Sequence, residues 1–195
     1  MRPIGSTVHL NKCLLATIGI VFISFHTASY AQSPSPFVKK DFEVPKILET
    51  SRFRLRMLSV NDVVKDFDAV TTSEKHIHDI WGPGWPKGLT LEQNLIDLGW
   101  HQKEFQRRSS FAYTVVALDE SRVLGCVYIN PTRKKGYDAE VYLWARQSEL
   151  ASGLEVELTA SVKAWLKDKW PFKNAVLPGT DISINEWDKV EELKR

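Results

Sequence analysis

Residues 111–146 read FAYTVVALDESRVLGCVYINPTRKKGYDAEVYLWAR, and this stretch decides the fold. Phe111–Leu118 and Val123–Ile129 are apolar runs rich in β-branched and aromatic residues. Ala139–Ala145 alternates aliphatic side chains with Glu140, Tyr142 and Trp144. Polar turns separate the three runs. Runs of this length between turn signals predict an antiparallel three-strand meander. Because the first two runs are apolar on both faces, we expect them to be central strands covered by helices.

Helix signals flank the meander on both sides. A capping-box pattern, in which two side chains satisfy the free N–H groups of a first helical turn, begins at Ser59, at Thr90 and at Ser152. Each pattern is followed by apolar side chains at helical spacing. We therefore expect helices over about 60–70, 91–108 and 153–169, a short helical turn over 73–80 and a terminal helix over 184–194.

Two further strands are expected outside the meander. Phe53–Leu58 alternates apolar residues with arginines, and Ala175–Leu177 is a short apolar run. The second of these is reached from the meander through a helix, and such a crossover places it parallel to the meander's last strand. The expected fold class is α/β (an α+β mixed sheet): an antiparallel meander plus a parallel crossover strand, with helices on both faces.

The apolar spacing also predicts which side chains are buried. Along the helix over 91–108, one face carries Leu91, Leu95, Leu98 and Phe105. The core should combine the strands with the helix over 153–169. Its expected members are Val115, Val127, Val141, Leu158, Val162 and Trp165.

The N-terminus has the pattern of an export signal. Cys13–Phe25 is a mostly apolar run, and Ser29-Tyr30-Ala31 places small residues where a signal peptidase reads them. We expect residues 1–31 to be a cleaved signal peptide, 32–50 to be a Ser/Pro-containing linker and 51–195 to be the folded domain. The protein would then be periplasmic or secreted, with no stable membrane span after cleavage. The alternatives are a cytoplasmic protein with a mis-called start, or a membrane-anchored one.

Composition limits the partners. The 195 residues suffice for one domain, and the formal net charge of +2 gives no basic field that would favour nucleic acid. Removing residues 1–31 leaves Cys126 as the only cysteine, so no intramolecular disulfide is expected. Cys126 lies inside an apolar run and is expected to be a small buried hydrophobe. The oligomeric state stays open.

Several short stretches occur within the predicted order of strand, two helices, three strands, helix and strand. They are Phe53-Arg54-Leu55, Gly82-Pro83-Gly84-Trp85-Pro86, Leu91–Asn94, Phe111–Val115, Val123–Ile129, Asp138–Val141, Ala164-Trp165-Leu166 and Trp170-Pro171-Phe172. Together they resemble the GCN5-related N-acetyltransferase (GNAT) superfamily, and in particular one bacterial branch of it. The resemblance covers about residues 51–190.

This resemblance implies an enzyme that transfers an acetyl group from acetyl-CoA, as co-substrate, to a small-molecule or peptide amine, without a metal. It places acetyl-CoA in a gap between the meander's last strand and the next parallel strand. The pyrophosphate would lie on backbone N–H groups at the following helix start. The implied cofactor-binding residues are Trp144, Ala145, Arg146, Gln147, Ala151, Ser152 and Gly153.

Two side chains beside this gap are candidates for acid–base catalysis. Glu140 lies near the start of the meander's last strand and could take a proton from the attacking amine. Tyr142 lies on the same face of that strand and could act as the acid. The plainer interpretation is that both are ordinary surface residues of a strand.

The phosphate loop departs from the family pattern Gln/Arg-x-x-Gly-x-Gly/Ala. If the pattern starts at Arg146, Glu149 replaces the glycine; if it starts one residue later, Leu150 does. The capping box at Ser152 and Glu155 would also consume free N–H groups. Glu149, Glu155 and Glu157 would repel a pyrophosphate. The alternative function is therefore a catalytically inactive GNAT-like ligand-binding or scaffold protein, and a third is an interaction module with a Trp-rich surface.

Two other groups of residues are candidate sites. His76 and His78, with His101, could bind a metal, but helical spacing turns the first two apart, so ordinary histidines are expected. The loop Gly82–Pro86 with Trp81 and Trp85 could form one wall of an acceptor pocket. The alternative is that these tryptophans only attach the loop to the core.

Overall fold

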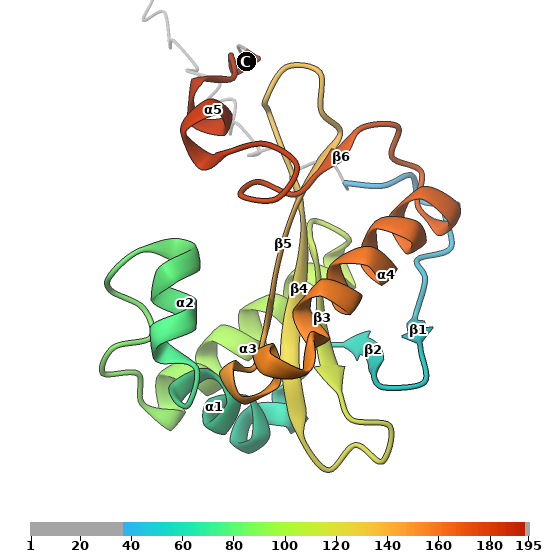
Figure 1. The fold of residues 1–195 in the computed structure, drawn as a ribbon. Coiled ribbons are helices and arrows are strands. Elements are labelled where there is room, and N and C mark those ends of the chain that lie inside the picture. The colour runs from blue at the N-terminus through green and yellow to red at the C-terminus, as the bar shows by residue number, and fades with distance from the viewer. Residues whose placement is uncertain (1–36, 194–195) are drawn as a thin grey trace, which may run out of the picture. The chain divides into compact units, whose positions relative to one another are not determined.

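The computed structural model describes residues 37–193, and in this range it shows one mixed sheet (Figure 1). The strands follow one another across the sheet in chain order. All neighbours are antiparallel except the last two, which are parallel as predicted. The strands are β1 Ile47–Glu49, β2 Arg54–Met57, β3 Phe111–Val116, β4 Val123–Pro131, β5 Ala139–Ala145 and β6 Ala175–Val176.

The helices also come in the predicted order. The terminal helix is shorter than expected, and a 3-10 segment precedes each of the helices that follow β2 and β5. The elements are η1 Val60–Asp62, α1 Val63–Thr71, α2 Glu74–Trp81, α3 Leu91–Arg107, η2 Gln147–Ser152, α4 Leu154–Lys169 and α5 Ile184–Lys189.

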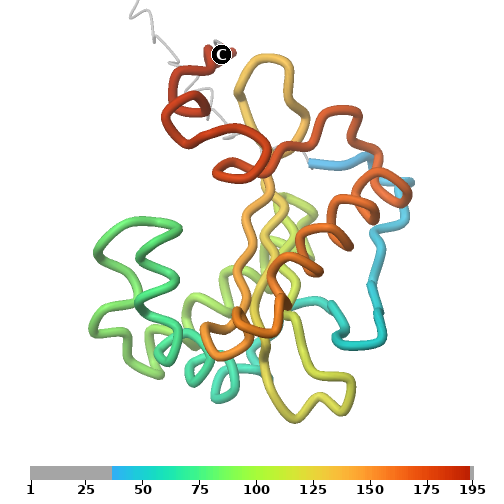
Figure 2. Tube along the Cα trace, viewed as in Figure 1, coloured from blue at the N-terminus to red at the C-terminus, as the bar shows by residue number. Residues whose placement is uncertain are grey.

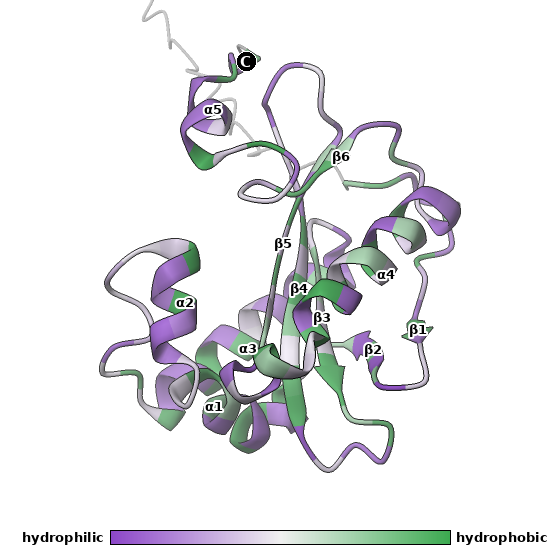
Figure 3. Ribbon diagram, viewed as in Figure 1, coloured by the Kyte–Doolittle hydropathy of each residue, from purple (hydrophilic) through white to green (hydrophobic). Residues whose placement is uncertain are grey.

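Helices cover both faces of the sheet, as Figure 1 and the chain trace in Figure 2 show. Helix α4 packs on one face, and α1 to α3 pack on the other. Figure 3 shows hydrophobic residues along the central strands and mixed hydropathy around the helices. The prediction of the core is confirmed, because all six residues expected there are buried: Val115, Val127, Val141, Leu158, Val162 and Trp165.

The folded domain begins earlier than residue 51. Phe37 stacks on Phe172 with ring centroids 4.9 Å apart, and Val38 is buried. Arg108 donates from Nη2 to the carbonyl of Lys39 at 2.6 Å. Strand β1 then pairs with β2. The part of the expected linker that the structure describes is therefore packed on the domain, while the expected signal peptide and its cleavage site lie outside the described residues.

The three predicted capping boxes had different outcomes. The box of Thr90 and Gln93 is present at the start of α3. Ser59 makes no capping bond, because the carboxylate of Asp62 accepts two hydrogen bonds from Arg56, at 2.7 and 2.8 Å. Two charge-assisted bonds outweigh one bond to a backbone N–H. The third box, at Ser152, is also absent and concerns the site described below.

The predicted buried face of α3 was partly wrong. Leu98 is buried, but Leu91 and Leu95 are 45% and 44% exposed. The inward face instead carries Asn94, whose amide donates to the carboxylate of Asp66 at 3.0 Å. A polar residue at a buried position misdirects an assignment based on apolar spacing alone.

Within residues 37–193, none of the helices combines the length and the apolar character that crossing a membrane requires. Cys126 is fully buried, as expected, and burial raises the pKa of its thiol.

Candidate functional site

The sheet opens between β5 and β6. The two strands pair at only two positions, Ala139 with Ala175 and Glu140 with Val176. The chain then turns away after Leu177, whose carbonyl accepts N–H bonds from the third and fourth residues after it. Beyond this point lies a cleft of about 890 Å³. Its walls are β5, the first turns of α4, the C-terminal end of α2 and the segment from Leu177 into α5.

Strand β5 presents backbone groups to this cleft. The Ala145 N–H points toward it, since it donates to the carboxylate of Glu155 at 2.9 Å, and Glu155 lines the cleft. Backbone groups alternate sides along a strand, so those of Leu143 face the same way. Strand β6 does not extend this far. The edge of β5 next to Leu143 is therefore available to an extended ligand.

Glu155 lines the cleft at its end nearest η2. Besides accepting from Ala145, its Oε2 lies 2.6 Å from Nε2 of His76 on α2. The predicted capping box is wrong here. The N-cap of α4 is Gly153, with φ 74°, and the Glu155 carboxylate bonds to Ala145 and His76 instead of to the helix start. The hydroxyl of Ser152 is engaged elsewhere, because it donates to the carbonyl of Glu149 at 2.7 Å.

The loop's carboxylates have cationic partners. Glu149 lies 3.1 Å from Arg122, and Glu157 lies 2.9 Å from Arg52. We expected these two residues, with Glu155, to repel a polyanion. Since an arginine adjoins Glu149 and Glu157, the net negative charge near the helix start is smaller than the sequence alone indicates.

Three of the residues implied to bind a cofactor are held inside the protein. The ring of Trp144 is fully buried against the helices α1 to α3, and Ala145 is also buried. The guanidinium of Arg146 turns away from the cleft toward α1, where it pairs with Asp68 and donates to Thr72 at 3.0 Å. None of the three side chains lines the cleft, and of the three residues only Ala145 directs its backbone N–H toward it.

The other four implied residues form the start of α4. The Gln147 N–H donates to Ser73 at 3.0 Å, which fixes η2 to α2. Ala151 and Ser152 are exposed on η2, and Gly153 caps α4. The first N–H groups of a helix lack partners within it. The Gly153 N–H is already used, because it donates to the carbonyl of Leu150 at 3.0 Å. An anion would therefore meet free backbone donors in the first turn of α4, which begins at Leu154.

The structure separates the two candidates for acid–base catalysis. Tyr142 lines the cleft, and partial burial raises the pKa of its hydroxyl. Glu140 is not among the cleft-lining residues. Its carboxyl faces Thr132 and Lys134 at the end of the β4–β5 hairpin, and burial raises its pKa.

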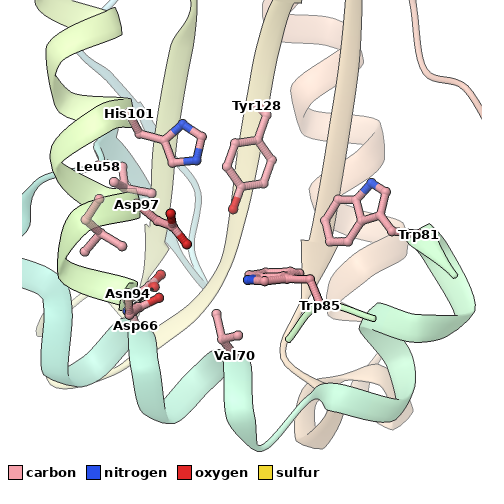
Figure 4. Close-up of a pocket in the computed structure, with 10 residues that line it drawn as sticks. Leu58, Asp66, Val70, Trp81, Trp85, Asn94, Asp97, His101 and Tyr128 are labelled. Carbon is pink, nitrogen blue, oxygen red and sulfur yellow. Dashed lines mark hydrogen bonds between the residues drawn. The ribbon is translucent and has the colours of Figure 1, made fainter. Parts of the chain in front are cut away.

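A second, smaller pocket lies on the face covered by α1 to α3, and Figure 4 shows it. Its volume is about 280 Å³. We call it the aromatic pocket. It is lined by Leu58, Asp66, Val70, Trp81, Trp85, Asn94, Asp97, Leu98, His101 and Tyr128.

Three aromatic side chains, Trp81, Trp85 and Tyr128, form one wall of the aromatic pocket. The rings of Trp81 and Trp85 meet edge to face at 5.9 Å, and Trp81 meets Tyr128 at 6.3 Å. His101 lies 5.2 Å from Tyr128, and burial lowers its pKa. Of the two alternatives considered for Trp81 and Trp85, the structure shows a pocket wall.

Sequence reasoning missed the carboxylate in this pocket. Asp66 is 3% exposed, and burial raises its pKa to about 6. It accepts from Asn94, and the thiol of Cys126 lies 3.5 Å from it. A signal was present, because Asp66 occupies a position between Val63 and Val70 on the apolar stripe of α1.

The three histidines considered as metal ligands lie apart from one another. Within residues 37–193, no three His, Cys, Asp or Glu side chains gather closely enough to hold a metal ion. His76 instead contacts Glu155, and His101 belongs to the aromatic pocket.

Comparison with known proteins gives the fold. No protein-family model matches the chain, and a search of curated proteins finds no match. Among solved structures, the microcin C7 self-immunity acetyltransferase MccE, in complex with acetyl-CoA and AMP, is 12% identical with a TM-score of 0.53. That match covers 66% of this chain and 69% of the other.

Ribosomal-protein acetyltransferases give similar matches. A ribosomal-protein-S5-alanine acetyltransferase from Vibrio fischeri is 16% identical, with a TM-score of 0.51, over 63% of this chain and 67% of the other. A Vibrio cholerae protein assigned as a ribosomal-protein-serine acetyltransferase has the same TM-score at 13% identity. That match covers 61% of this chain and 65% of the other, so the chain spans about two thirds of the length of these structures. The described domain has the fold of the GNAT acetyltransferases.

Proposed function

We propose that this chain, which has the GNAT fold, is an N-acetyltransferase that binds acetyl-CoA in the cleft between β5 and β6. The observation that carries the proposal is the cleft itself. Two parallel strands separate after two paired residues, and the uncovered edge of β5 faces about 890 Å³ of open space. An extended chain with amide groups can pair with such an edge.

The residues present fit the two ends of this co-substrate. Its amide-containing arm would pair with β5 near Leu143, and its phosphates would meet the N–H groups in the first turn of α4. Arg52 and Arg122 lie beside this helix start and already offset its carboxylates. Glu155 is the residue that opposes binding, because it occupies the N–H of Ala145 with a carboxylate.

Acetyl-CoA supplies an activated acyl group, and side chains of the protein must accept one proton and donate another. An amine nitrogen bonds to the thioester carbon, the carbon–sulfur bond breaks, the nitrogen loses one proton and the sulfur gains one. Tyr142 lines the cleft and stays protonated at neutral pH, so it suits the donor to sulfur. Glu140 lies two residues away on the same face of β5 but does not line the cleft. We propose that it accepts the proton from nitrogen through one intervening water.

One observation favours the alternative of a ligand-binding protein without acetyl transfer. The bond from the Ala145 N–H to Glu155 uses a donor at the end of the cleft where the phosphates would lie. In that case the cleft would hold another ligand, and Glu155 would be part of its closed end.

Release of free CoA thiol tests the proposal. Purified protein is incubated with acetyl-CoA and primary amines, and thiol is titrated over time. We expect amine-dependent release that Tyr142→Phe slows by about 100-fold, within the range for loss of a general acid. Tyr137→Phe is the matched control, because Tyr137 does not line the cleft, although it packs on the cleft residue Trp187. Binding of acetyl-CoA with no release at all would favour the alternative.

A further inference from the structure

The aromatic pocket contains buried negative charge without a compensating cation. Asp66 is 3% exposed, and Asp97 lines the same pocket from α3. Among residues 37–193, neither carboxylate lies within ion-pair distance of a lysine, arginine or histidine. A buried carboxylate is costly to a protein unless something pairs with it. Asn94 supplies a hydrogen bond to Asp66 but no charge.

The rest of the pocket wall suits the same kind of ligand. Figure 4 shows Asp97, Tyr128 and Trp85 directed toward one shared space, with Asp66 beside Asn94 at its base. Aromatic faces attract cations and also pack against alkyl chains. The lining includes no lysine or arginine, and His101 is largely neutral because burial lowers its pKa.

We propose that the aromatic pocket binds an aliphatic ammonium group. The carboxylates of Asp66 and Asp97 face the positive charge, and the rings of Trp81, Trp85 and Tyr128 surround the alkyl chain. An anion would meet two carboxylates, and a purely apolar ligand would leave Asp66 uncompensated. The volume of about 280 Å³ suits a small amine rather than a folded partner.

The pocket's position indicates the role of the bound cation, and this step rests on the proposed function. Trp81 lines both the aromatic pocket and the cleft. An ammonium group has no lone pair and cannot attack a thioester, so the group held at Asp66 is an anchor. A second amino group on the same molecule would extend past Trp81 to Tyr142. The inferred acceptor is therefore a diamine.

Nuclear magnetic resonance of the tryptophan indole N–H groups tests binding without acetyl-CoA. The probes are butylamine at pH 7.5, with butanol and butyrate as uncharged and anionic controls. We expect butylamine to shift the signals of Trp81 and Trp85. The signals of Trp165 on α4 and of Trp170 at its C-terminal end, which belong to the other core cluster, should stay unchanged. Neither control molecule should shift any signal at the same concentration.

Substitutions test the two carboxylates. Asp66→Asn and Asp97→Asn should each weaken butylamine binding at least about 10-fold, which corresponds to about 1.4 kcal/mol. Asp97 is exposed, so its substitution leaves the fold intact even if that of Asp66 does not. Asp41→Asn is the matched control on the exposed N-terminal segment and should change nothing. Equal binding of butylamine and butanol, or no effect of Asp97→Asn, would overturn the proposal.

The acceptor assay separates this inference from the proposed function. With acetyl-CoA present, 1,4-diaminobutane should release CoA thiol at least about 10-fold faster than butylamine. Shifts of Trp81 and Trp85 without thiol release would support the ammonium site and contradict the transferase. Thiol release at equal rates from both amines, with no shift of either tryptophan, would support the transferase and contradict the ammonium site.

Discussion

Tyr128 on β4 and Tyr142 on β5 are register partners, yet they line different spaces. Tyr128 belongs to the aromatic pocket and Tyr142 to the cleft. Because directly opposed residues on neighbouring strands point to the same face of a sheet, the two spaces adjoin along this pair. This adjacency lets one molecule occupy both of them.

Replacing the buried carboxylate should stabilise the unliganded protein at neutral pH. The pKa of Asp66 is raised from 3.8 to about 6 by burial, so the folded state favours the protonated form. Below pH 3.8 the group is protonated in both states and burial of charge costs nothing. Above pH 6 the full cost applies, which for this difference in pKa is about 3 kcal/mol. Asp66→Asn should therefore raise the free energy of unfolding at pH 7.5 by up to this amount.

Urea unfolding at pH 4.5 and pH 7.5 measures this effect. The gain from Asp66→Asn should shrink at the lower pH, where wild-type Asp66 is mostly protonated. Asp62, Asp97 and Cys126 face Asp66 and are unchanged in the variant. Asp97→Asn is the matched control and should leave stability nearly unchanged at both values. A variant less stable than wild type at pH 7.5 would contradict the cost assigned here to the buried charge of Asp66.

The packing of α4 on the sheet should be a main source of stability. Leu158 is fully buried among the strands. Leu158→Ala leaves a cavity there and should cost roughly 2–5 kcal/mol of unfolding free energy. Val156→Ala, on the exposed side of the same helix, is the control and should cost little. A loss below about 1 kcal/mol at Leu158 would contradict the described packing.

Removing the charge of Glu155 should tighten the binding of acetyl-CoA. Glu155→Gln keeps an oxygen that can accept from Ala145 but takes a negative charge away from the site of the phosphates. We expect about a 5-fold lower dissociation constant at low salt and a smaller gain at high salt, because salt screens the charge. Glu92→Gln is the control for net charge, because Glu92 is an exposed residue of α3. Unchanged affinity at low salt would mean that the phosphates lie elsewhere.

We propose that residues 1–31 are removed on export, which the described residues do not address. Mass spectrometry of the protein expressed with its full N-terminus should find Gln32 as the first residue. Full-length protein that retains Met1 in the cytosol would contradict export. It would also place the protein in the compartment that contains acetyl-CoA.

The sheet was predictable because its signals are local. Runs such as Val123–Ile129 are apolar on both faces and bounded by turns, and the core residues of α4 follow helical spacing. The positions of charged side chains were not predictable in the same way. Glu155 and Asp62 fit a capping pattern, but each bonds to a partner that tertiary structure brings near.

The aromatic pocket shows the same limit. Its members come from α1, α2, α3 and β4, and nothing in the spacing of Asp66 and Tyr128 along the chain indicates that they meet. In the sequence, only Trp81 and Trp85 beside the loop Gly82–Pro86 indicated a pocket. Asp66 itself appeared as one acidic residue in an amphipathic helix.

Calorimetric titration with acetyl-CoA tests the central claim most directly. Wild-type protein is compared with Thr159→Trp, which places a ring into the cleft, and with Ala160→Trp, which places the same ring on the exposed side of α4. We predict micromolar binding by wild type and by Ala160→Trp, and binding at least about 10-fold weaker by Thr159→Trp. Equal affinity of all three proteins, or no heat with wild type, would contradict the assignment of the β5–β6 cleft as the acetyl-CoA site.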